Sequence, residues 1–434
     1  MKILLHIIRY EWMNLWRSNT LKVLLVVVFG AGMYGIYFGK FEIQKQELRM
    51  QQVQQYERQQ FDSLLHWVLL DTTLADNQVK FRQATSPTGV GWNKHFTYYL
   101  SNDAPDAAGL CLGQRDLFPV YYGFNVTDLA RQVNVGELAN PMKLLTGNFD
   151  LSYVYVFLFP LLVIALFYSL YAGEKEGGTL SLLRAQPMAL PMVLLSKGLL
   201  RLLLVWGLAL VLLVLGFVFQ GISFTNIGLF SQWLFLVFGY CLLWAVLMGV
   251  VVWLRRGTAL SAMMGLAVWL IFTLIAPALL NLFVLANEPL PNRAEVIHVV
   301  RNLNDKNWES PKSFVFEKFY SENPQYNQGD TTDFSKWYYA SFTLLDKEAD
   351  LLKVNFEEQV NKRNALIEKW QWLAPAATVH EKLAEISNTD RQSHIKFLDE
   401  VYQYHEELKE LYYARIFDGQ QFSVEDLELI SQKL

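Results

Sequence analysis

The stretch that decides the fold is residues 173–201, GEKEGGTLSLLRAQPMALPMVLLSKGLLR. It is a short polar segment between two apolar runs, residues 151–172 and 202–220, and neither run contains a charged residue. An uncharged apolar run of about 20 residues is long enough to cross a bilayer as a helix. The sequence therefore predicts two membrane spans joined by residues 173–201, which we call the central loop.

The composition indicates a membrane protein with several spans. Of the 434 residues, 53% are hydrophobic and 18% are charged, against roughly 25% charged residues in soluble domains. The net charge of −4 argues against a nucleic-acid partner. Cys111 and Cys241 are expected to stay unpaired, because the second falls inside a span and the first outside the membrane. We predict an all-α polytopic membrane protein with five transmembrane helices, at residues 21–38, 151–172, 202–220, 230–254 and 260–282.

The segments around these spans differ in character. Residues 1–20 form a predicted amphipathic helix with basic residues on its polar face and tryptophan at its apolar edge, suited to the membrane interface; its marker residues are Arg9, Trp12, Trp16 and Arg17. Residues 39–150 and 287–434 are polar and long, and we expect two largely helical extracytoplasmic segments there.

The distribution of basic residues predicts the orientation. Lysine and arginine near span ends are biased toward the cytoplasm. They occur before the first span, in the central loop, and at Arg255 and Arg256 between the fourth and fifth spans, whereas residues 221–229 have none. With five alternating spans, the N-terminus and the central loop are cytoplasmic and both large segments are outside.

The chain lacks the residue patterns of an enzyme or an ion-driven carrier. No predicted span contains Asp, Glu, Lys or Arg in its interior, and carriers coupled to ions usually keep such a residue on their pathway. There is no G-x-x-x-x-G-K-[ST] nucleotide loop, no G-x-S-x-G elbow and no histidine pair at metal-ligand spacing. We predict no enzymatic activity, no metal site and no cofactor in this chain.

The central loop contains the residue pattern that points to a partner. Glu174, Lys175 and Glu176 open it, leucines follow, and Pro187 and Pro191 end the short helix. A short amphipathic helix protruding on the ATP side is suited to bind a separate ATPase. An ordinary solvated connector fits the same pattern.

At these residues the sequence resembles a known family, the type-2 ABC (ATP-binding cassette) exporter permeases. The loop after their second span has an acidic residue, G-T-L, leucines, a proline and a K-G pair, which match Glu174, Gly178, Thr179, Leu180, Leu183, Pro187, Lys197 and Gly198. Residues 2–17 are similar to their interfacial elbow helix. Residues 113–122 are similar to a stretch in a subgroup with large extracytoplasmic loops.

The resemblance implies the partners and the location. In this family the elbow and the loop bind a separate ATPase subunit, which holds ATP and Mg²⁺, and two permeases, identical or sister chains, line the path. It implies a multi-pass protein of the bacterial cytoplasmic membrane, in contact with membrane lipid. These permeases have six spans with both termini inside. With five runs here, we expect either a last span beyond Leu434 or a C-terminal domain that ends outside.

Three functions follow as hypotheses. The first is a permease subunit of an ATP-driven exporter, whose uncharged spans suit a lipid-like, peptide or amphipathic substrate. The second is a membrane protein that uses the same ATPase for mechanical work on an envelope partner without transport. The third is a membrane-anchored binding module without an ATPase, for which substitutions at Glu174 and Leu183 leave function intact.

Overall fold

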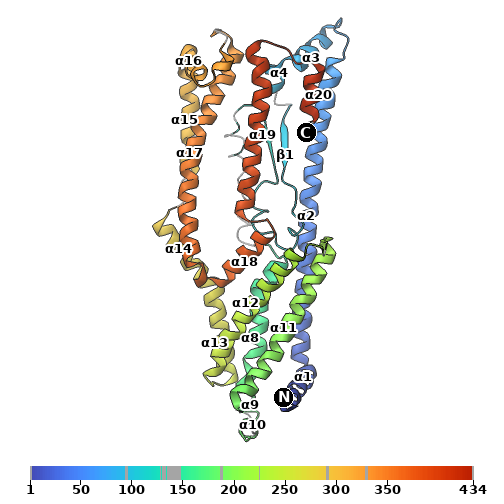
Figure 1. The fold of residues 1–434 in the computed structure, drawn as a ribbon, viewed down its shortest axis with the longest axis vertical. Helices are drawn as coiled ribbons and strands as arrows, with labels where there is room; N and C mark the ends of the chain where they lie inside the picture. The colour runs from blue at the N-terminus through green and yellow to red at the C-terminus, as the bar shows by residue number, and fades with distance from the viewer. Residues whose placement is uncertain are drawn as a thin grey trace.

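The computed structural model is predominantly helical and elongated (Figure 1). It describes residues 2–92, 96–127, 129, 133, 148–185, 189–223, 225–289, 293–327 and 331–432. A compact bundle of apolar helices forms one half of the molecule, and long polar helices project from one of its ends (Figure 1). The predicted helical class is confirmed, apart from one two-stranded antiparallel sheet of β1 (Tyr98–Ser101) and β2 (Tyr121–Phe124).

Five helices of the described residues are long and apolar enough to cross a membrane, as the sequence predicts. They are α2 (Asn19–Val68), the composite Leu151–Glu176, α11 (Leu190–Gln220), α12 (Ile227–Trp253) and the composite Thr258–Asn287. The first composite consists of α7 (Leu151–Tyr153), the π-helical turn η1 (Val154–Leu158), α8 (Phe159–Phe167) and α9 (Ser169–Glu176). The second consists of α13 (Thr258–Leu270), the π-helical turn η2 (Ile271–Ile275) and α14 (Ala276–Asn287).

Helix α2 continues far beyond the apolar run predicted at residues 21–38. Its apolar part lies between Lys22 and Lys40, about 27 Å apart at 1.5 Å per residue. The Gln- and Glu-rich sequence after Lys40 consists of good helix formers, so the helix continues to Val68. Gly39 lies within this helix. Its missing side chain lets the backbone of Gly109 approach: a Cβ atom at Gly39 would lie 1.9 Å from the Gly109 carbonyl oxygen.

Helix α8 is the centre of the bundle. It packs against α2, α11, α12 and α13, and Leu162 and Val163 have no exposed surface. Pro160 lacks an N–H and so leaves the Val156 carbonyl without its usual i+4 donor. The Tyr240 hydroxyl donates a hydrogen bond to that carbonyl at 3.0 Å. The Trp269 indole N–H donates to the carbonyl of Phe157 at 3.3 Å, so two carbonyls of η1 accept hydrogen bonds from side chains of α12 and α13.

The polar segments predicted at residues 39–150 and 287–434 share one hydrophobic core. It includes Phe61 of α2, Tyr98 of β1 and Phe319, Tyr412 and Leu427 from the C-terminal segment. The remaining elements of this outer domain are the helices α3 (Ala75–Thr85), α4 (Pro87–Trp92), α15 (Arg293–Glu309), α16 (Lys312–Glu322), α17 (Phe334–Trp370), α18 (Pro375–Ile386), α19 (Arg391–Asp418) and α20 (Val424–Gln432), and the 3-10 turns η3 (Pro324–Tyr326) and η4 (Gln371–Leu373).

Two elements join the outer domain to the bundle. Residues 107–112 lie over the bundle end: Leu110 is fully buried, and the buried Asp150 accepts from the Leu112 N–H at 2.8 Å. The second element is α18, at the bend between α17 and α19 (Figure 1), which contacts α12 and both π-helical turns. We call this end of the bundle the outer end and the opposite end the loop end.

Candidate functional site at the loop end of the bundle

The central loop makes a sharp turn at a glycine. Helix α9 is followed by Gly177 as C-cap and then by Gly178, whose φ of +74° lies in the left-handed region. That conformation costs a residue with a Cβ roughly 1–2 kcal/mol. Thr179 follows, and its hydroxyl donates to the backbone carbonyl of Glu174 at 3.3 Å and contacts the Glu174 carboxylate. The predicted G-T pair therefore closes the loop back onto α9.

The second half of the predicted loop is helical. Helix α11 begins at Leu190, whereas the sequence placed the start of the third span at residue 202. Pro191 lies in the first turn, where its missing N–H costs nothing and its fixed φ favours a helix. Lys197 and Arg201 are therefore residues of helix α11 and not of a loop. Pro187, predicted as a docking residue, lies outside the described residues.

A partly buried charge network joins α11 to α1 (Lys2–Arg17) and α9. Glu11 of α1 is 1% exposed and forms ion pairs with Lys197 at 3.1 Å and Arg201 at 2.5 Å. Lys197 also pairs with Glu174 at 2.5 Å. Arg201 donates in addition to the carbonyl of Leu166 and to the Ser169 hydroxyl. Two carboxylates thus balance two cations, as buried charges require.

A further carboxylate connects the loop to the fifth apolar helix. Glu176 accepts from the backbone N–H of Thr258 at 2.8 Å and from its hydroxyl at 2.7 Å. Thr258 is the first residue of α13, so Glu176 caps a helix N-terminus, where a negative charge is favourable. The three basic segments of the sequence therefore lie at one end of the bundle, as Figure 1 shows for α1, α9 and α10.

Helix α1 lies beside α11 and exposes an aromatic surface. Trp12 and Trp16 are exposed and stack on each other at a centroid distance of 5.8 Å. Arg9 and Arg17 are exposed too. The sequence pattern predicts these four residues as the marker residues of α1 but does not single out Glu11, which ties α1 to the bundle. The available signal was a single acidic residue in an otherwise basic amphipathic helix.

The short helix α10 (Leu180–Arg184) presents a different leucine from those predicted. Leu180 packs against the bundle core and Leu183 is half-buried, whereas Leu182 is 67% exposed. A partner that binds this helix would therefore meet Leu182 first. Within the described parts of the chain, no group of three or more His, Cys, Asp or Glu side chains is placed to hold a metal ion.

The comparisons with known proteins concern the outer domain. Residues 293–432 match a family described as "Domain of unknown function (DUF3526)". No curated protein matches the chain, and no solved structure matches it. The matched residues run from α15 to α20, so the helix bundle, α1 and the central loop lie outside the match.

Proposed function

We propose that this chain is the membrane permease subunit of an ATP-driven exporter, with ATP bound by a separate ATPase subunit. The observation that carries the proposal is the partly buried network of Glu11, Lys197, Glu174 and Arg201, which fixes α1 to the start of the central loop. In this proposal the chain lies in the bacterial cytoplasmic membrane, with its N-terminus in the cytoplasm. A second copy or a sister permease completes the path for a lipid-like, peptide or amphipathic substrate.

The membrane placement is supported by the distribution of charge. Basic residues of three separate segments gather at the loop end, which fits the cytoplasmic side. The turn at the outer end, residues 221–229, contains no charge. The apolar part of α2 between Lys22 and Lys40 matches the roughly 30 Å hydrocarbon thickness of a bilayer.

The network provides a path by which force from a partner can reach the helix bundle. Force on α10 acts through Gly178 and Thr179 on Glu174, and Glu174 is bonded to Lys197 of α11. Glu11 transmits the same displacement to α1. A separate ATPase that grips α10 therefore moves α1, α9 and α11 together, which is the coupling that an exporter requires.

The test is co-purification of an ATPase with the tagged full chain from detergent extract. Leu182→Asp places a charge on the exposed face of α10, and Ser181→Asp is the matched control on the same helix. Leu183→Asp tests the half-buried leucine. We expect ATP hydrolysis by a subunit with a nucleotide-binding loop in the parent and control preparations, and its loss in Leu182→Asp. If the parent contains no such subunit, or Leu182→Asp retains it fully, the proposal is wrong.

A second candidate function is mechanical work on an envelope partner, and the position of α18 favours it. This helix connects α17 to α19 and contacts both π-helical turns, η1 and η2. π-Helical turns are local departures from regular helix geometry that often occur at functional sites. In vesicles, ATP hydrolysis stimulated by a transported substrate supports export. Stimulation by a protein bound to the outer domain, without transport, supports mechanical work.

A further inference from the structure

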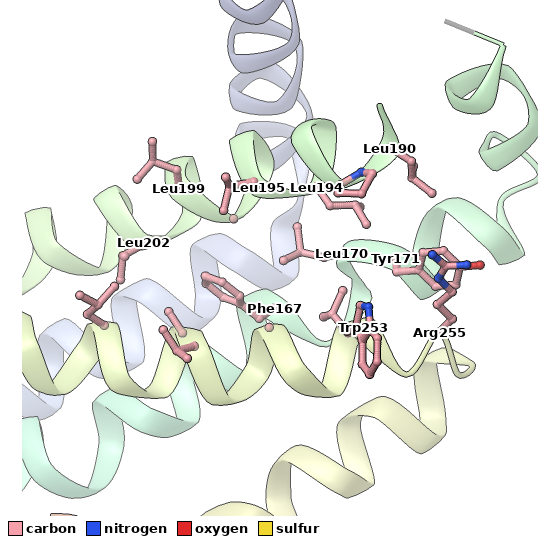
Figure 2. Close-up of a pocket in the computed structure, with 17 residues that line it drawn as sticks. Phe167, Leu170, Tyr171, Leu190, Leu194, Leu195, Leu199, Leu202, Trp253 and Arg255 are labelled. Atoms are coloured by element: carbon pink, nitrogen blue, oxygen red, sulfur yellow. The ribbon is translucent and has the colours of Figure 1, made fainter. Parts of the chain in front are cut away.

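An apolar groove lies on the bundle near the loop end (Figure 2). Its volume is about 380 Å³, and it runs between α8 and α9 on one side and α11 and α12 on the others. Leu195 and Leu199 of α11 and Val246 of α12 line it and are exposed. Pockets of about 300–1,000 Å³ are typical for small ligands. The groove is therefore large enough for a flexible apolar chain.

The groove has one charged residue, at its loop end. Arg255 follows the C-cap of α12 and has a left-handed φ of +54°. No described residue forms an ion pair with its guanidinium. Trp253, which also lines the groove, is 75% exposed, and tryptophan is enriched at the level of lipid headgroups. A cation and an exposed tryptophan thus mark the loop end of the apolar groove.

We propose that this groove binds one anionic phospholipid, with an acyl chain along α11 and α12 and the phosphate at Arg255. The inference rests on the membrane placement in the proposed function, but not on transport. Arginine binds phosphate through two parallel hydrogen bonds. A second copy of the chain covering the groove would bury Arg255, which is unfavourable unless that copy supplies a counterion. The charge therefore favours a lipid over another apolar helix as the occupant.

Two glycines of α12 provide a matched test of the apolar part. A Cβ atom at Gly249 or at Gly239 meets no other atom within 4 Å, so a side chain can begin at either position without displacing a neighbour. Gly249 lines the groove and Gly239 does not. Gly249→Leu therefore fills the groove, and Gly239→Leu adds the same side chain elsewhere on the same helix. For the charge, Arg255→Gln is compared with Arg256→Gln, because Arg256 does not line the groove.

The experiment is native mass spectrometry of the full chain, extracted from vesicles of equal parts phosphatidylglycerol and phosphatidylcholine. We expect the parent, Gly239→Leu and Arg256→Gln to retain one phosphatidylglycerol in preference to phosphatidylcholine. Arg255→Gln should lower that preference about tenfold, since it removes charge-assisted hydrogen bonds, and Gly249→Leu should abolish retention. Equal retention in all variants overturns the proposal. Displacement of the retained phosphatidylglycerol by inorganic phosphate also overturns it. A dimer of the chain that Gly249→Leu disrupts overturns it as well.

Flotation of the chain with the vesicles distinguishes a failure of the lipid proposal from a failure of the proposed function. A chain that does not float contradicts the membrane placement itself. A chain that floats, but retains lipid equally with and without Gly249→Leu, contradicts only the groove. The ATPase co-purification is independent of both results, because it depends on α10 and not on the groove.

Discussion

The two ends of the helix bundle are held by different kinds of contact. At the loop end, the tips of long charged side chains meet: Glu11, Lys197, Glu174 and Arg201 connect three helices. At the outer end, backbone meets backbone: a Cβ atom at Gly39 would lie 1.9 Å from the Gly109 carbonyl oxygen, and a Cβ at Gly35 would lie 2.8 Å from the carbonyl oxygen of Asp150.

The difference assigns different roles to the two ends. Charged side chains have several rotatable bonds, so this pairing can persist while the three helices it joins move together against the rest of the bundle. Backbone contact at a glycine leaves no such freedom, because close-packed interiors have few alternative arrangements. We therefore interpret the loop end as the deformable end and the outer end as the fixed end.

The largest expected effect comes from removing the one acidic residue of α1 in the network. Glu11→Ala takes a carboxylate from two buried cations, and such a loss costs about 3 kcal/mol or more. We expect α1 to open from α11 more readily, because Glu11 makes the only ion pairs between α1 and the bundle among the side chains that the structure describes. Hydrogen exchange of residues 9–17 should accelerate by about a hundredfold, since local opening sets exchange protection.

A double-mutant cycle isolates this interaction from other effects of the substitution. Lys197→Met removes the facing charge and keeps a side chain of similar length. If the pair stabilises α1, the double variant should be less destabilised than the sum of the two single variants. Additive changes would show that the loop end does not depend on this pairing.

A smaller effect tests the outer end. Gly39→Ala places a methyl group against the Gly109 backbone, which has no flexible side chain to move aside. Overpacking of this kind costs about 1–3 kcal/mol. Gly30→Ala is the control on the same helix, because a Cβ there meets nothing within 4 Å. Denaturant unfolding of the detergent-solubilised chain should separate the two; equal stability would contradict the assignment of a rigid outer end.

Much of the bundle could be predicted from the sequence, because apolar runs without charge are a signal of composition alone. The five helices follow from it, and so does the grouping of the basic segments at one end. The residues at which the helices begin and end could not be predicted from these runs. The sequence predicts a loop for Lys197 and Arg201, because charge usually marks a span boundary. The pairing with Glu11 and Glu174 lets α11 include both residues.

The shared outer core could not be predicted from the sequence. Tyr98 and Tyr412 come from the two polar segments, and their hydroxyl groups lie 2.5 Å apart. Neither segment has a periodic pattern that specifies such a long-range pair. Likewise, Leu180, Leu182 and Leu183 look equivalent as a leucine-rich turn. Their different burial depends on the direction that the chain takes after Gly178.

The smallest expected effect is a pH dependence of stability in the outer domain that α1, at the loop end, does not share. His405 of α19 is buried in the outer domain against the Phe124 ring; burial, with the nearby Lys409 charge, lowers its pKa from 6.5 to about 3. The unfolded state therefore binds a proton that the folded state excludes, and stability falls as the pH drops below 6.5. Between pH 7.5 and 5.5 we expect a loss of about 1.4 kcal/mol from this residue, seen as a lower protection factor in α19 once the slower intrinsic exchange at low pH is corrected for. His405→Gln should flatten that dependence while exchange in α1 keeps the parent profile; an unchanged slope in α19 would mean that the ring has the same pKa in the folded and unfolded chain.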